Sequence, residues 1–135
     1  MSKLMTAREY EESLRKLGLR VYMFGRRVEN VVDDPIIRPS MNAVAATYEY
    51  AHRPEYEDIM TAKSHLTGKK INRFTHIHQS TEDLVKKSKM GRLLGSLTAC
   101  CFQRCVGMDA LNALSITTHA IDAKYGTGYY QRFLK

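Results

Sequence analysis

Apolar residues recur every three or four positions along most of this chain, which is the period of amphipathic helices. The first helix is predicted over residues 7–17. Thr6 and Glu9 have the spacing of a capping box at its start, and Gly18 is a natural stop at its end. Its apolar stripe consists of Tyr10, Leu14 and Leu17.

The middle of the chain alternates between short ordered stretches and loops. Residues 21–24 are apolar and β-prone, so we predict an extended connection or a single short strand there. Pro35 and Pro39 mark loops, because the residue before a proline is pushed away from helix. Helical periodicity resumes over residues 41–51, and a short helix is predicted over residues 55–62.

Two longer helices are predicted in the second half of the chain. A cap signal at Ser80 precedes a helix over residues 81–94. We expect Gly95 to interrupt this helix, and a longer one, which carries the cysteines, to run over residues 97–124. The amphipathic pattern then resumes in residues 131–135.

The 135 residues are enough for one domain with its own hydrophobic core. We therefore predict a mostly α fold over residues 1–135, with four or five helices and at most a trace of strand. Hydrophobic residues make up 44% of the chain and charged residues 26%, which is typical of a soluble globular protein.

Several classes of protein are disfavoured by the same composition. No apolar run approaches the ~20 residues of a membrane span, and the N-terminus lacks the apolar core of a signal peptide. Three cysteines are an odd number, so a disulfide framework is not expected. These features indicate a cytoplasmic protein without membrane contact.

The formal net charge is +7, and much of the excess lies between Lys63 and Arg92. A basic surface attracts polyanions such as nucleic acid. A solvated face is the more common role of such a run, so we expect no nucleic-acid partner. The basic residues between these two are Lys69, Lys70, Arg73, Lys86, Lys87 and Lys89.

The most informative feature is a cysteine pair. In a helix, Cys101 and Cys105 share one face, with Cβ atoms roughly 5–6 Å apart, and Cys100 points about 100° away. Two thiolates at this spacing reach two corners of one iron–sulfur cluster, but such clusters usually have four protein ligands. The pair is therefore either half of a cluster site or two thiols packed in a helix seam. The predicted stripe contains Leu97, Cys101, Cys105, Met108 and Asn112, and it suits both interpretations.

Other polar candidates are weaker. His76 and His78 place two imidazoles on one side of an extended segment, but a zinc site needs two further ligands, and none is evident. Arg92 lies in an apolar segment, where it either extends to solvent or serves a buried anion. Gln103 lies between the cysteines and is a generic polar position unless a ligand is placed there.

Eight short motifs occur in order along the chain, and the longest contains the cysteine pair. They are VYMFG (21–25), IRPS (37–40), LTGK (66–69), INRFT (71–75), HQST (78–81), RLLG (92–95), CFQRCVGMDA (101–110) and KYGT (124–127). Together they resemble the N-terminal segment of the 4-hydroxybutyryl-CoA dehydratase (vinylacetyl-CoA Δ-isomerase) branch of the 4-hydroxyphenylacetate 3-monooxygenase flavoprotein family. The monooxygenase branch lacks the cysteine pair.

The resemblance implies the helical N-terminal domain of an acyl-CoA-dehydrogenase-like fold, whose middle β domain and C-terminal helical domain are absent from this chain. It also implies FAD and a [4Fe–4S] cluster in a homotetramer. Cys101 and Cys105 match two cluster ligands, and the other two, a histidine and a cysteine, lie far downstream. Arg92 and Gln103 match polar residues that line the active site. Cys100 departs from the family pattern, which has a small residue there.

The implied reaction is dehydration of 4-hydroxybutyryl-CoA to crotonyl-CoA, with vinylacetyl-CoA isomerisation beside it. In this family, FAD acidifies the β carbon by a transient one-electron oxidation, and the cluster is a Lewis acid for the leaving hydroxyl. The expected partners are an acyl-CoA substrate and the remainder of the enzyme or a complementing subunit. This segment alone is expected to be inactive.

Two alternatives stay open. One is a split subunit of another member of the flavoprotein family. The other is a free-standing basic helical binding module, which would leave the cysteine pair unexplained.

Overall fold

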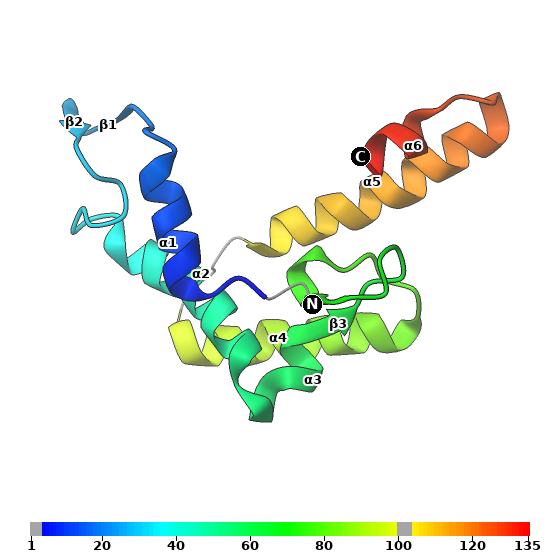
Figure 1. The fold of residues 1–135 in the computed structure, drawn as a ribbon, viewed down its shortest axis with the longest axis horizontal. Helices are drawn as coiled ribbons and strands as arrows, with labels where there is room; N and C mark the ends of the chain where they lie inside the picture. The colour runs from blue at the N-terminus through cyan, green and yellow to red at the C-terminus, as the bar shows by residue number, and fades with distance from the viewer. Residues whose placement is uncertain (1–3, 100–103) are drawn as a thin grey trace.

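The computed structural model describes residues 4–99 and 104–135. Two arms rise from a common base (Figure 1). The α-helices are α1 (Ala7–Lys16), α2 (Arg38–Glu49), α3 (Glu57–Met60), α4 (Thr81–Thr98), α5 (Arg104–Tyr125) and α6 (Tyr129–Phe133). The strands and short 3-10 helices are β1 (Val21–Met23), β2 (Arg26–Val28), β3 (Thr61–Lys63), β4 (Lys70–Asn72), η1 (Tyr50–His52), η2 (Pro54–Tyr56) and η3 (Arg73–Thr75).

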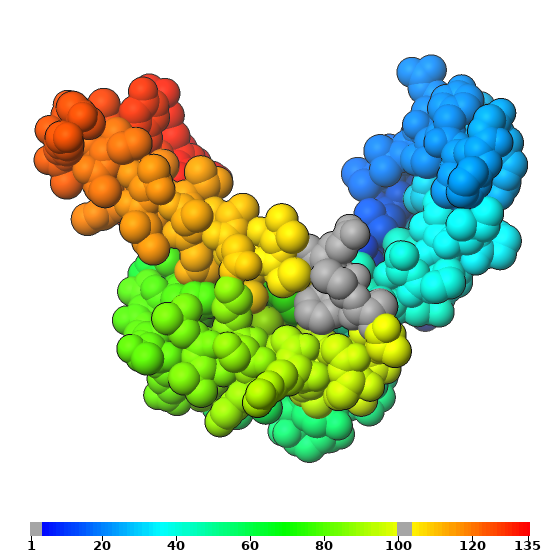
Figure 2. All heavy atoms as spheres, turned by 180° about the vertical axis from the view of Figure 1, so that it is seen from behind, coloured from blue at the N-terminus to red at the C-terminus, as the bar shows by residue number. Residues whose placement is uncertain are grey.

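The space between the arms is a surface hollow, which we call the notch (Figure 2). On one side lie α1 and the β1–β2 hairpin, and on the other lie α5 and α6. The base contains α3, α4 and the β3–β4 hairpin, and α5 begins beside it, at the floor of the notch. The predicted mostly α fold class is confirmed, because the strands form only two small two-stranded sheets among the described residues.

The predicted first helix is confirmed together with its capping box. The backbone N–H of Glu9 donates to Thr6 Oγ1 at 3.2 Å, and the Thr6 N–H donates to Glu9 Oε2 at 2.7 Å. These bonds satisfy two backbone donors at the helix start. Gly18 follows the helix with a φ of +59°, which fits its predicted role as a stop.

The short strand predicted over residues 21–24 is the first half of an antiparallel hairpin, in which Val21 faces Val28. Its two-residue turn consists of Phe24 and Gly25, with φ values of +51° and +75°. Positive φ at both positions is the geometry of a type I′ turn. The second strand was not anticipated, because Arg26 and Arg27 lack the apolar alternation that indicates a strand.

The helix predicted over residues 41–51 begins earlier than expected, at Arg38. Pro39 is compatible with this start because it lies in the first helical turn, where its missing N–H is not needed. The helix predicted over residues 55–62 is wrong at its end: α3 stops at Met60. Thr61 begins β3, which pairs antiparallel with β4.

Two predictions about the cysteine-bearing half of the chain are wrong. Gly95 does not interrupt α4, which continues to Thr98. The single helix expected over residues 97–124 is not formed, because Ala99 adopts a left-handed conformation, with φ at +51°, and ends α4 there. The described part of α5 begins at Arg104 and ends at Tyr125, before Gly126 in the left-handed region.

The core lies where α2, α3, α4 and α5 meet the 3-10 helices of the base. Its buried residues are Ala43, Ala51, Met60, Phe74, Met90, Leu94 and Met108. Three methionines fill much of this space, which suits an irregular junction because their side chains are unbranched and adaptable. Among the described residues, no helix has the length and apolar character needed to cross a membrane.

Candidate functional site

The first turn of α5 carries Cys105, the second residue of that helix. Cys105 is a free thiol and is half-buried. Cys105 is the only member of the predicted cluster pair that lies within the described residues, because Cys101 lies outside them. Gln103 and Cys100 also lie outside the described residues. The spacing argument for the cysteine pair therefore stays a prediction.

Arg104 holds this turn through a stack of side chains from four elements. Its guanidinium carbon lies 4.4 Å from the centroid of the Tyr48 ring and 4.4 Å from that of Phe74. Tyr10 of α1 stacks on Tyr48, with their ring centroids 4.7 Å apart. We call Tyr10, Tyr48, Arg104 and Phe74 the arginine stack. It joins α1, α2, η3 and α5 at the floor of the notch.

Among the described residues, no carboxylate neutralises the charge of Arg104. Its Nη1 donates to Thr47 Oγ1 at 2.5 Å, and no acidic side chain within 4–99 or 104–135 forms an ion pair with it. Burial lowers the pKa of Arg104, and Tyr48 and Tyr10 oppose that change. The aromatic faces therefore take the place of a counter-ion, since a ring face attracts a cation electrostatically.

The buried face of α5 differs from the predicted stripe. Arg104, Met108 and Asn112 follow one another at intervals of four, and each makes a tertiary contact. Cys105 lies at the edge of this face, three residues before Met108. Leu97, the first member of the predicted stripe, belongs to α4 and is exposed, so its place in that stripe was wrong.

Asn112 fixes α5 two turns beyond Arg104. Its Oδ1 accepts the backbone N–H of His78 at 2.8 Å, and its Nδ2 donates to the backbone carbonyl of His76 at 3.2 Å. One side chain thus satisfies two backbone groups of the segment before α4. Arg104 and Asn112 together determine how α5 leaves the base.

A second polar network orders the segment that Asn112 contacts. Asp83 Oδ1 pairs with Arg73 Nη1 at 3.2 Å, and Asp83 Oδ2 lies 3.1 Å from His76 Nε2. Arg73, which is 3% exposed, also donates to the backbone carbonyls of Asp58, Ile59 and Thr61. Burial alone would raise the pKa of Asp83. Hydrogen bonds from the Gln79 amide, His76 and Arg73 outweigh it and lower that pKa to about 2.

His76 and His78 do lie near each other, with ring centroids 6.1 Å apart. Burial, followed by the neighbouring His76, lowers the pKa of His78. Within the described ranges, no group of three histidine, cysteine, aspartate or glutamate side chains is placed to hold a metal ion. In the part of the chain that the structure describes, the pair therefore has no further ligands of the kind that a zinc site requires.

Arg92 lies in α4 with its side chain exposed to solvent. It forms no hydrogen bond or ion pair with other residues of the described ranges. The structure therefore leaves its guanidinium accessible and does not join it to Cys105 by a polar contact.

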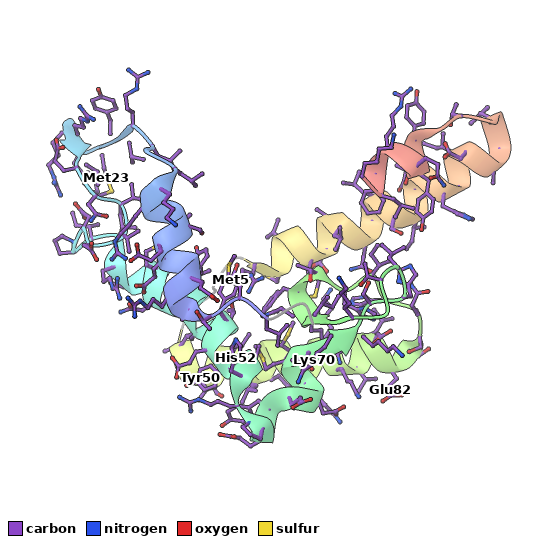
Figure 3. All side chains as sticks on the ribbon, in the orientation of Figure 1. Met5, Met23, Tyr50, His52, Lys70 and Glu82 are labelled. Atoms are coloured by element: carbon purple, nitrogen blue, oxygen red, sulfur yellow. The ribbon has the colours of Figure 1, made fainter. Side chains whose placement is uncertain are left out.

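Half of the basic residues from Lys63 to Arg92 form ion pairs. Lys70 pairs with Glu57 at 2.6 Å, and Lys86 pairs with Asp58 at 2.5 Å and with Glu82 at 3.2 Å. Lys70 and Glu82 lie on separate parts of the base (Figure 3). Lys87 pairs with Asp109 and connects α4 to α5. Surface ion pairs of this kind are compatible with a solvated face, which stays a prediction.

Cys105 fits one position of an iron–sulfur cluster, because its free, half-buried thiol is the donor that such clusters use. The described residues do not complete a site. A cluster here therefore needs donors from outside the described ranges. Arg104 was missed by the sequence analysis, and the available signal was a charged residue at helical spacing with buried Met108.

Comparison with known proteins agrees with the motifs. The protein 4-hydroxybutyryl-CoA dehydratase/vinylacetyl-CoA-Δ-isomerase of Clostridium aminobutyricum is 65% identical over 130 residues, which cover 96% of this chain and 26% of that protein. A solved oxygen-tolerant archaeal 4-hydroxybutyryl-CoA dehydratase from N. maritimus superposes with a TM-score of 0.92 at 54% identity. That match covers 98% of this chain and 26% of the other.

The monooxygenases are more distant. The oxygenase component of 4-hydroxyphenylacetate 3-monooxygenase, solved in complex with FAD, superposes with a TM-score of 0.59 at 26% identity. It covers 69% of this chain and 19% of the other. The chain thus spans about a quarter of the length of its dehydratase relatives. Residues 6–135 match the family described as 4-hydroxyphenylacetate 3-hydroxylase N terminal, and the chain belongs to that family.

Proposed function

We propose that this chain is the N-terminal part of an enzyme that dehydrates 4-hydroxybutyryl-CoA to crotonyl-CoA and also isomerises vinylacetyl-CoA. The observation that carries this proposal is the 65% identity to the clostridial dehydratase over 96% of the chain. Identity to the flavin-dependent oxygenases is lower, at 26% for the FAD complex. The TM-score of 0.92 to the archaeal dehydratase supports the same branch.

In this proposal, residues 1–135 form the helical N-terminal domain, and the middle β domain and C-terminal helical domain belong to the remainder of the enzyme or to a complementing subunit. The enzyme is a cytoplasmic homo-oligomer. Its FAD is bound mostly outside this chain. The match to an oxygenase solved with FAD supports a flavin in the complete protein.

Cys101 and Cys105 are proposed as two of the four ligands of a [4Fe–4S] cluster. Their spacing and the free thiol of Cys105 support this assignment. When bound, the cluster supplies a Lewis acid for the leaving hydroxyl, and FAD supplies the transient oxidation that makes the β hydrogen acidic. Within this chain, the task of the cysteines is to supply thiolate donors, of which Cys105 lies in the first described turn of α5.

Arg92 and Gln103 are proposed to line the acyl-CoA pocket. The exposed guanidinium of Arg92 has no partner in the described ranges, so its donors are available to carbonyl or phosphate oxygens of a substrate. Gln103 follows Cys101 by two residues, which suits an amide that orients the substrate beside the cluster.

The test is anaerobic iron–sulfur reconstitution of this chain, alone and mixed with the polypeptide that carries the downstream domains. Iron content and visible absorption are measured in each case. We expect a cluster only in the mixture, and its loss in Cys101→Ala and in Cys105→Ala. Cys100→Ala is the matched control, because it removes a thiol outside the proposed ligand pair and should retain the cluster.

A mixture that binds no iron, or that keeps a full cluster in both ligand variants, would contradict the assignment of Cys101 and Cys105. Turnover of 4-hydroxybutyryl-CoA by the reconstituted mixture tests the reaction separately. A mixture that instead hydroxylates phenols in the presence of reduced flavin would favour the monooxygenase branch.

A further inference from the structure

We infer that Arg104 is a positioning residue for Cys105: the arginine stack holds the first turn of α5 so that this thiolate stays in place for the cluster. The inference rests on the proposed function, because it concerns how the proposed cluster is retained. It assigns a task to a residue that lies between the two cysteines in sequence and to which the proposed function gives no role.

The first support is the cost of the arrangement. A half-buried guanidinium with no carboxylate partner among the described residues has a desolvation cost, and an apolar side chain would fill a site beside two rings with less desolvation. Arg104 instead keeps its charge between Tyr48 and Phe74, both at 4.4 Å. The desolvation cost of Arg104 indicates that its side chain has a geometric task that an aliphatic side chain cannot perform.

The second support is directional control. The guanidinium is planar, so its contacts with two rings and one hydrogen bond to Thr47 restrict both its position and its rotation. Thr47 and Tyr48 belong to α2, and Phe74 belongs to η3, so the restraint joins α5 to two separate elements. Lysine could supply the charge but not the planar contact.

The third support is position. Arg104 and Cys105 are consecutive in the first described turn of α5, and the next tertiary hydrogen bonds of this helix lie further along it, at Asp109 with Lys87 and at Asn112. Displacement of Arg104 would therefore move Cys105 directly, whereas Asn112 would still hold the rest of the helix. Residues that orient metal ligands typically change metal retention about 10- to 100-fold when removed.

The experiment uses the full-length protein with its cluster and FAD. Arg104→Met and Arg104→Lys are compared with the unaltered protein by the anaerobic rate at which an iron chelator removes the cluster. The rate is followed by visible absorption, and cluster EPR spectra, flavin content and melting temperature are recorded for each. We expect cluster loss about tenfold faster in both variants, with altered EPR spectra and full flavin content.

Arg53→Met is the matched control, because Arg53 also lies 4.4 Å from a tyrosine ring centroid, that of Tyr50, but far from α5 in sequence. It should leave the chelation rate and the spectra unchanged. If Arg104→Met does not fold, Tyr48→Leu removes one face of the stack and should accelerate cluster loss by a smaller factor.

Chelation rates within twofold of the unaltered protein would overturn the inference, as would equal acceleration in Arg53→Met. Full rescue by Arg104→Lys would also overturn it, because the planar contact would then be unnecessary. An unaltered protein that holds no cluster would count against the proposed function itself, so the two failures are distinguishable.

Discussion

At the scale of single residues, Asp83 and Arg73 organise the base of the molecule. Asp83 accepts hydrogen bonds from the Gln79 amide and Arg73, and it faces His76. Arg73 in turn contacts three backbone carbonyls around α3 and β3. The Asp83 carboxylate therefore connects the start of α4, through Arg73, to the backbone where α3 ends and β3 begins.

We predict that Asp83→Asn destabilises the chain by about 2 kcal/mol at pH 7, since the buried Arg73 would lose its charged partner. The folded-state pKa of Asp83, about 2, lies below its ordinary value of 3.8, so the carboxylate stabilises the fold above about pH 4. That contribution is lost as the pH falls toward 2. Urea unfolding at pH 7 and pH 3 should show the difference between the two proteins shrinking at the lower pH.

Asp58→Asn is the control for this prediction. The side chain of Asp58 is 79% exposed and pairs with Lys86 on the surface, where ion pairs contribute at most ~1 kcal/mol. A loss at Asp58 as large as that at Asp83, or a difference independent of pH, would contradict the role assigned to Asp83.

At the scale of secondary-structure elements, the β1–β2 hairpin carries local strain. Phe24 is 82% exposed and adopts a left-handed backbone, although bulky residues disfavour that region. In the described structure its ring gains little from burial. The turn geometry therefore overrides the preference of this residue, and Gly25 beside it provides the second positive φ.

We predict that Phe24→Asn raises the stability of the chain by about 0.5–1 kcal/mol, because Asn-Gly is the favoured pair for a type I′ turn. Thermal unfolding of the two proteins measures the effect. Tyr22→Asn is the control: Tyr22 is also exposed but lies in β1, where asparagine is disfavoured, so no gain is expected. A loss of stability in Phe24→Asn would show that the aromatic ring has a packing role.

At the scale of the whole molecule, α5 exposes apolar residues along the arm that borders the notch. The exposed apolar residues include Val106, Leu114, Ile116 and Tyr125. Aliphatic side chains such as the first three are normally buried when they form a contiguous patch. A helix that is apolar on several faces is normally buried. The dehydratase relatives are about four times longer than this chain, and in the enzyme proposed above the further domains would cover this surface.

We predict that the isolated 135-residue chain is helical but marginally stable, binds a hydrophobic dye and self-associates. Light scattering and circular dichroism during heating measure this behaviour. Val106→Ser with Ile116→Ser should reduce dye binding, whereas substitution of the exposed Thr117 by Ser should not. A monodisperse monomer with a cooperative melting transition would contradict the prediction.

The elements that the sequence determined by itself are those with local signals. Thr6 and Glu9 are three residues apart, Ser80 caps α4 through the amide of Asp83, and Gly126 follows the last residue of α5. Each of these contacts joins neighbours in the chain, so its residue types and spacing are sufficient. The family motifs are visible for the same reason, since they are short continuous runs.

The tertiary structure alone decided the features that depend on distant partners. Thr47 and Arg104 are 57 positions apart, and no local pattern indicates that Tyr48 and Phe74 will enclose that guanidinium. The helical periodicity of the sequence also failed to predict β3. Residues 61–63 form a strand because they pair with β4, and a local pattern does not show this pairing. Gly95 continues α4 instead of ending it, because packing of Met90 and Leu94 in the core outweighs a weak local preference.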